Sequence, residues 1–160
     1  MAHITIEYII MIPVLVMQIF LFPLAANWLM NIWVDSRRTL ALQDVASHLG
    51  STLQQLYFSL NHGTILAGTV TYSPKFPSLI EDSVYAASAT LRTVLDPMMN
   101  SSKVLDLTVR LISSGKAVAI SVVLGPNVLW QTSTFSSNST NARVTATKSS
   151  NGTITLGFAG

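Results

Sequence analysis

The pattern of hydrophobic and polar positions divides the chain into three consecutive segments. In the first, 27 residues from Tyr8 to Val34 follow one another without a charged side chain. A membrane-spanning helix needs about 20 such residues, and a helix that is apolar all round must otherwise be buried all round. We therefore expect a helix surrounded by lipid or by other chains. Pro13 and Pro23 should bend it, because each removes a helical hydrogen bond.

The second segment begins at Asp35, where the polarity changes abruptly. Apolar residues then recur three and four positions apart and form one stripe of a helix. Gly63 is the predicted stop signal, because glycine adopts the left-handed conformation that closes a helix. The pattern predicts one helix from about residue 3 to residue 61, about 85 Å long at 1.5 Å per residue. The stripe consists of Leu42, Val45, Ala46, Leu49, Leu53, Leu56 and Leu60.

The third segment, residues 63–160, changes to the period of two that is typical of strands. Leu105, Leu107 and Val109 alternate with polar residues, which predicts a half-buried strand. The run "AVAISVVL" is apolar on both faces and is predicted to be a central strand, and Asn151-Gly152 predicts a hairpin with a longer loop. The expected strands are residues 65–72, 84–95, 104–112, 117–124, 128–134, 142–147 and 153–158.

These patterns predict an α+β protein, with a long N-terminal hydrophobic helix followed by a small antiparallel β-sandwich-like globular domain. Residues 1–62 form the helix in this interpretation. Its residues 1–34 are the hydrophobic part, and its residues 35–62 are the amphipathic part that packs on the β domain. Residues 63–160 form the outward-facing β domain.

Composition excludes several functional classes. The 160-residue chain is 49% hydrophobic and only 10% charged, against about 25% charged in an average soluble domain. Its net charge of +2 is spread without runs, so no nucleic-acid-binding surface is expected. It has no cysteine, which excludes disulfides, thiolate metal sites and cysteine nucleophiles. The low charge favours assembly or membrane contact over a solvated monomer.

Residues suited to catalysis or metal binding are scattered. His3, His48 and His62 do not lie at metal-binding spacings with carboxylates. The chain also lacks a glycine-rich phosphate loop and a Gly-x-Ser-x-Gly motif. We therefore expect neither an enzyme nor a metal or cofactor site.

Glu7 stands at the front edge of the apolar run. A carboxylate inside an apolar helix is costly, by a few kcal/mol at the bilayer centre, and usually marks a paired or functional position. The alternative is that Glu7 only complements the positive end of the helix dipole, which is worth less than about 1 kcal/mol. Spacing alone leaves both interpretations open.

The stretch "HITIEYIIMIPVLVMQIF", residues 3–20, resembles the N-terminus of type IV pilin-like proteins, particularly archaeal adhesion pilins with a class III signal peptide. The resemblance implies that Glu7 neutralises the N-terminal amine of a neighbouring subunit and that Tyr8 is the aromatic residue that follows. It also implies processing by a prepilin peptidase, a membrane-inserted state before assembly, and a pilus assembly machinery.

The pilin pattern places this glutamate fifth in the mature chain, which would make His3 the first residue. No lysine or arginine precedes Glu7, so the basic leader of the family is missing here. Either the mature chain begins at Met1 with the glutamate displaced by two, which we favour, or cleavage follows Ala2. The early Ile-Pro is also similar to Tad-type minor pilins, so the subclass stays open.

Two further features bear on the side of the membrane. Arg37 and Arg38 follow the apolar run and predict a cytoplasmic C-terminus for a simple single-pass protein. In a pilin they are expected to lie outside and to pair with Asp35 or Asp44 of this or a neighbouring subunit. The β domain contains three sequons, at Asn100, Asn138 and Asn151, which are candidates for N-glycosylation in a secreted chain.

The sequence thus favours a major pilin, which polymerises with identical subunits through its N-terminal helix into an extracellular adhesive filament at the cell surface. The main alternative is a single-pass membrane-anchored surface binding protein. A Tad-like minor pilin and an archaellum-type subunit are alternatives within the filament class.

Overall fold

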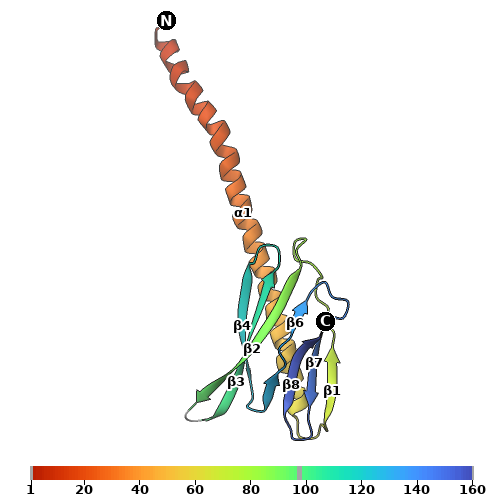
Figure 1. Cartoon of the computed structure of the whole chain (residues 1–160). Coiled ribbons are helices and arrows are strands. Elements are labelled where there is room, and N and C mark those ends of the chain that lie inside the picture. The colour runs from red at the N-terminus through yellow and green to blue at the C-terminus, as the bar shows by residue number, and fades with distance from the viewer. Residues whose placement is uncertain (1, 97–98, 160) are drawn as a thin grey trace. The chain divides into compact units, whose positions relative to one another are not determined.

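The computed structural model describes the backbone of residues 2–96 and 99–159, and the side chains of residues 9, 11–94 and 102–159. Helix α1 (Ala2–Asn61) is followed by eight strands (Figure 1). The long helix and the β region after it confirm the predicted α+β fold class. The strands are β1 (Gly68–Tyr72), β2 (Tyr85–Asp96), β3 (Met99–Leu111), β4 (Ala117–Leu124), β5 (Val128–Trp130), β6 (Thr134–Ser136), β7 (Arg143–Lys148) and β8 (Ile154–Ala159).

The chain forms two compact units, residues 1–37 and residues 38–160. The described residues of the first unit, 2–37, are all helical, and α1 continues through Pro13 and Pro23. The second contains the rest of α1 and all eight strands. The hydrophobic core of the described chain lies in this second unit.

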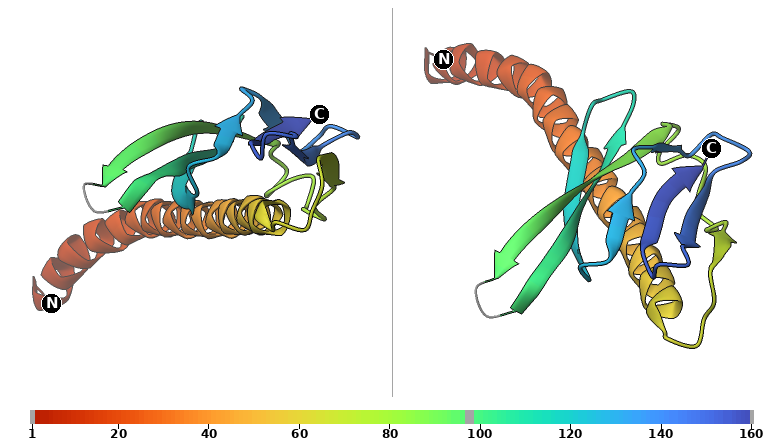
Figure 2. Two further views of the ribbon diagram at one scale, coloured as in Figure 1. Left: turned by 90° about the horizontal axis from the view of Figure 1, so that it is seen from below. Right: turned by 60° about the horizontal axis from the view of Figure 1, so that its bottom comes forward.

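Residues 38–61 of α1 are held by the stripe that the sequence predicted. Its members Leu42, Leu49 and Leu53 are completely buried, and Leu56 is half-buried. Tyr57, which the stripe did not include, is buried as well. Figure 2 shows both sheets on one side of this part of the helix. The helix therefore forms one layer of the unit and the sheets form the other.

The end of α1 differs from the prediction in one respect. Gly63 does not adopt the left-handed conformation, which among the described glycines is found at Gly115 and Gly152. Instead the His62 carbonyl accepts hydrogen bonds from Ile65 N at 3.2 Å and from Lys148 Nζ at 3.0 Å. A turn and a lysine from β7 therefore close the helix, rather than a glycine cap.

The strands form two four-stranded sheets, in the orders β4-β3-β2-β6 and β1-β7-β8-β5. All pairings are antiparallel except that of β5 with β8, which is parallel. The predicted alternation of β3 is confirmed, because Leu105, Leu107 and Val109 are buried while Arg110 is exposed. The predicted hairpin of β7 and β8 is also confirmed. Gly152 has a φ of 82° in its loop, which runs from Ser149 to Thr153.

Two strand predictions were wrong. β4 is not a central strand but the edge of its sheet, next to β3. Its apolar run suggested two covered faces, yet Ala119 and Val123 are exposed. The single strand predicted at residues 128–134 is two three-residue strands, β5 and β6, which belong to different sheets. The chain leaves β5 at Gln131, whose N–H donates to the Leu156 carbonyl at 2.8 Å.

Candidate assembly surface

The first unit exposes an uncharged apolar surface. All described side chains from residue 9 to residue 33 are exposed, and they include Phe22 at 80% and Trp28 at 64% of their full area. We call this region the apolar helix surface. Mean hydropathy reaches 1.8 within α1, so the helix is long and apolar enough to cross a membrane by length and composition.

This surface is energetically unfavourable in water. Fully burying one large aliphatic or aromatic side chain contributes about 1.5–3 kcal/mol, and more than a dozen such side chains are exposed between residues 9 and 33. Contiguous apolar patches of this kind mark membrane or protein contacts. The apolar helix surface therefore needs a covering partner, which is lipid or other protein.

Three amides that were not predicted as functional residues interrupt the apolar surface. Gln18, Asn27 and Asn31 are exposed within the helix. Asn27 and Asn31 are four residues apart, with Asp35 four residues further, so they follow one another on one face. Amides that lie between apolar helices form hydrogen bonds from helix to helix. The four-residue spacing is the sequence signal that would have identified this polar row.

The polar end of the apolar helix surface is marked by Trp33 and Arg37. The Arg37 guanidinium carbon lies 4.8 Å from the centre of the Trp33 ring, within the range of a cation–π contact. Tryptophan and arginine at the end of an apolar helix suit the boundary between hydrocarbon and water. This pair places the end of the apolar helix surface at about residue 34.

Arg38 belongs to the second unit, and it forms an ion pair that was not predicted from the sequence. Its Nε lies 3.3 Å from a carboxylate oxygen of Glu81. Glu81 and Asp82 have positive φ angles, 43° and 60°, in a turn closed by mutual backbone hydrogen bonds of Ile80 and Ser83 at 3.0 Å. Positive φ is uncommon for residues other than glycine, so the ion pair helps to hold an otherwise strained turn against α1.

The structure places the predicted assembly and modification residues as follows. The backbone of Glu7 and Tyr8 lies within α1, while their side chains lie outside the described residues. Asn100 lies in β3, and its side chain is also outside the described residues. Asn138 and Asn151 are exposed in loops. The structure therefore leaves the roles of Glu7 and Tyr8 as predictions.

No family model, curated protein or solved structure matches this chain. The resemblance to type IV pilins thus rests on residues 3–20, and it stays a hypothesis. Any functional argument depends on the surfaces and contacts of the chain itself.

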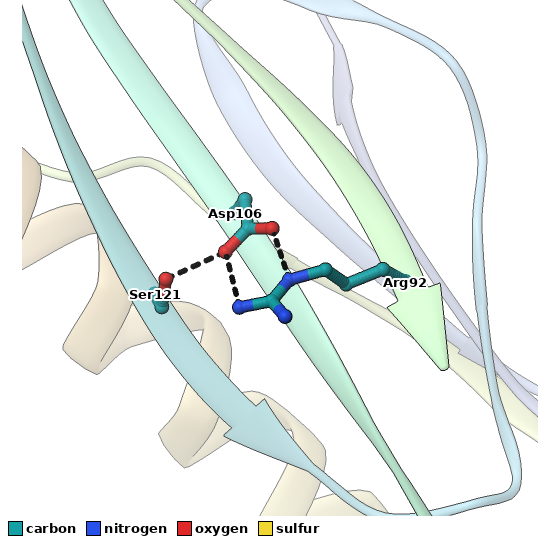
Figure 3. Close-up of polar contacts among 3 residues, drawn as sticks. All are labelled: Arg92, Asp106 and Ser121. Atoms are coloured by element: carbon teal, nitrogen blue, oxygen red, sulfur yellow. Dashed lines mark hydrogen bonds and ion pairs between the residues drawn. The ribbon is translucent and has the colours of Figure 1, made fainter. Parts of the chain in front are cut away.

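One polar cluster of the second unit lies across three strands (Figure 3). Asp106 of β3 accepts hydrogen bonds from Ser121 of β4 at 2.5 Å and from Arg92 Nε of β2 at 2.6 Å. The Ser121 hydroxyl, and after it Arg92, lowers the pKa of Asp106. A carboxylate with a lowered pKa is a weaker base. The cluster is therefore suited to joining strands and not to activating Ser121 as a nucleophile.

Metal ligands do not gather in the described part of the chain. Within it, no group of three or more His, Asp or Glu side chains lies close enough to hold a metal ion. The apolar helix surface is therefore the feature of the described chain that most needs a functional explanation.

Proposed function

We propose that this chain is a structural subunit, a major pilin, of an extracellular type IV pilus-like filament that polymerises through the first half of α1. The observation that carries the proposal is the apolar helix surface, which is uncharged, exposed all round and longer than about 30 Å of hydrocarbon requires. Helices of identical neighbouring subunits would cover it on every side. Such a contact between different faces of identical chains does not close, and it generates a helical filament.

The division into two units supports this proposal. Residues 38–160 have their own core, in which the α1 stripe packs with both sheets. This unit can therefore stay folded while residues 1–37 exchange lipid for the helices of other subunits. A pilin needs this property, because its subunits are stored in the membrane before a pilus assembly machinery extracts them. In the filament the β domain would face outward, at the cell surface, where adhesion takes place.

The resemblance of residues 3–20 adds one proposed partner and one role. A prepilin peptidase would process the chain, and Glu7 would neutralise the N-terminal amine of a neighbour, with Tyr8 beside it. Glu7 would then set the register between subunits, since an unpaired carboxylate among apolar helices is costly.

The second candidate is a single-pass surface binding protein that never polymerises. The contact between Trp33 and Arg37 favours it, because this pair suits a permanent boundary between membrane and water. In that case the apolar helix surface stays in lipid, and no filament forms.

Electron microscopy of sheared surface material from cells that produce the chain separates the two functions. We expect filaments in the sheared material, and mass spectrometry should identify their main protein band as this chain. The same spectra would locate the first mature residue. If the protein remains entirely in the membrane fraction and the sheared material contains no filament made of it, the pilin proposal is wrong.

A further inference from the structure

The outer edge of β4 is open for a further strand. β4 pairs with β3 on one side and has no strand on its other side among the described residues. The Val123 carbonyl accepts a hydrogen bond from Gln54 Nε2 at 3.3 Å, so its peptide groups point away from β3. In an antiparallel strand the peptide groups of alternate residues point to the same side. Those of Ala119 and Ser121 therefore point to the open edge as well.

This edge lacks the features that usually prevent strand addition. Exposed edges are commonly short or carry charges or proline. β4 has eight residues, AVAISVVL, without a charge or a proline. By contrast, β2 pairs with β6 only at residues 86–88, and the open part of β2 carries Arg92 and Asp96. Apart from the Gln54 bond to the Val123 carbonyl, the β4 edge is therefore long and uncharged, whereas β6, the other edge strand of this sheet, has only three residues.

A groove runs between this edge and helix α1. Its volume is about 380 Å³, and the helix contributes Ser47, Gly50, Ser51 and Gln54 to its wall, opposite residues 120–123 of β4. Gly50 allows the close approach, because a Cβ there would lie 2.6 Å from the Ile120 side chain. The hydroxyl and amide groups on the helix side can bond to the backbone of a strand laid along the groove.

The other sheet ends in an exposed, uncharged strand. β1 is the edge strand of its sheet and pairs with β7. All five of its residues, GTVTY, are exposed, with Val70 at 42% and Tyr72 at 43%. The strand is uncharged and rich in residues that favour extended structure. β1 pairs with β7 along all five residues, while both of its faces and its outer edge are exposed.

We propose that the open edge of β4 in one subunit accepts β1 of a neighbouring subunit, so that the sheets of adjacent copies become continuous. The occupant is a second copy because this chain carries both halves of the contact, an open eight-residue edge and an exposed five-residue strand, and neither is charged. The two strands end different sheets, so the contact is heterologous and repeats from copy to copy. This proposal rests on the filament function, and it assigns the β domain a part in holding the filament together.

Crosslinking tests the contact directly, because the chain has no cysteine of its own. The test uses the double variants A119C/T71C and A119C/V70C, in the full chain, with a short bis-maleimide. Neighbouring residues of β1 point to opposite faces, so one of the two pairs lies on the face of Ala119. Directly opposite and diagonal cross-strand neighbours lie within about 8 Å. We expect a ladder of covalent oligomers from one double variant.

The matched control is T93C/T71C, which moves the first cysteine to an exposed position in the charged part of β2. It should give no ladder. A ladder from the control that equals that of A119C would overturn the proposal. So would dimers from the single A119C variant in place of a ladder from the double variants, because these indicate that β4 pairs with β4.

Proline provides a second test that does not depend on crosslinking. The N–H of Ala119 points to the open edge, so A119P should fold normally while blocking an added strand. A119T retains the N–H and is the control. We expect A119P to reduce the filament yield at least tenfold and A119T to leave it unchanged. Normal filaments from a folded A119P variant would overturn the proposal.

The two proposals fail in distinguishable ways. If the wild-type chain forms filaments but the double variants give no crosslinked ladder, the edge contact is refuted and the pilin function stands. If a ladder forms in the membrane fraction without any filament, the edge contact stands and the pilin function is refuted. If neither a filament nor a ladder forms, both proposals are refuted.

Discussion

The hydroxyl of Tyr57 donates a hydrogen bond to Asn127 Oδ1 at 2.9 Å, and this contact joins helix α1 to the loop after β4. Asn127 Nδ2 in turn donates to Asn61 Oδ1 and to the Gly152 carbonyl, both at 2.9 Å. One asparagine thus connects the end of the helix with the hairpin of the other sheet. Burial raises the pKa of Tyr57, and a hydrogen bond with the backbone of Gly125 partly offsets that effect.

Gly125 makes the Tyr57 contact sterically feasible. A Cβ at this position would lie 1.9 Å from the Tyr57 hydroxyl oxygen. We expect Gly125→Ala to displace the tyrosine and destabilise residues 38–160 by about 1–3 kcal/mol, as overpacking does. The loss of stability can be measured by denaturant unfolding of the full chain in detergent, with near-UV circular dichroism as the signal. Gly63→Ala is the control, because nothing lies within 4 Å of its added Cβ, and an equal loss there would contradict the explanation.

Tyr85 makes stability depend on pH in the alkaline range. Its ring is fully buried, its hydroxyl donates to the Pro77 carbonyl at 2.8 Å, and burial raises its pKa from 10.0 to about 12. The folded state holds this proton more tightly than the unfolded state. The associated stability is therefore complete below about pH 10 and is lost as the pH rises toward 12. We expect Tyr85→Phe to have a flatter stability profile in this range, and an unchanged slope would contradict the assignment.

Asp106 makes stability depend on pH in the opposite direction, in the acidic range. Ser121 and Arg92 lower its pKa, so the folded state releases this proton more readily than the unfolded state does. The stability it contributes is present above its ordinary pKa of about 4 and is lost as the pH falls below that value. We expect Asp106→Asn to reduce the loss of stability on acidification, measured as the unfolding midpoint between pH 5 and pH 2. An unchanged slope in the Asp106→Asn variant would contradict this assignment.

Glu7 tests the proposed register between subunits. If its carboxylate neutralises the amine of a neighbour, Glu7→Ala should insert into the membrane normally and yield at least tenfold fewer filaments. Glu7→Asp keeps the charge and should restore part of the yield. Membrane fractionation and electron microscopy measure the two steps separately. If the alanine variant forms filaments of normal number and length, Glu7 only complements the positive end of the helix dipole.

The exposed sequons differ in their suitability for modification. The Asn151 side chain is engaged in its hairpin, where its Oδ1 accepts a hydrogen bond from Thr153 N at 3.0 Å. Asn138 lies exposed in the loop between β6 and β7. We expect glycosylation at Asn138 in preference to Asn151. Intact mass spectrometry of filaments would then show a loss of glycan mass for Asn138→Gln and none for Asn151→Gln; the reverse result would contradict this order.

Features with a local cause could be predicted from the sequence. The apolar helix follows from the uncharged run of residues 8–34. The stripe centred on Leu49 and the alternation around Leu107 each follow from a period of side chains within one element. Such periods report which face of an element is covered. The hairpin at Asn151-Gly152 is local as well, because its turn needs a residue with positive φ, and Gly152 provides it.

Only the tertiary structure decided which strands are neighbours and which edges stay open. A period of two cannot distinguish the edge strand β4 from a central strand, because an apolar run looks the same in both places. Nor could it divide residues 128–134 between two sheets. The contacts of Tyr57 with Asn127 and of Arg38 with Glu81 join residues far apart in the chain. They depend on how the strands fold back over the helix, and no local pattern records that path.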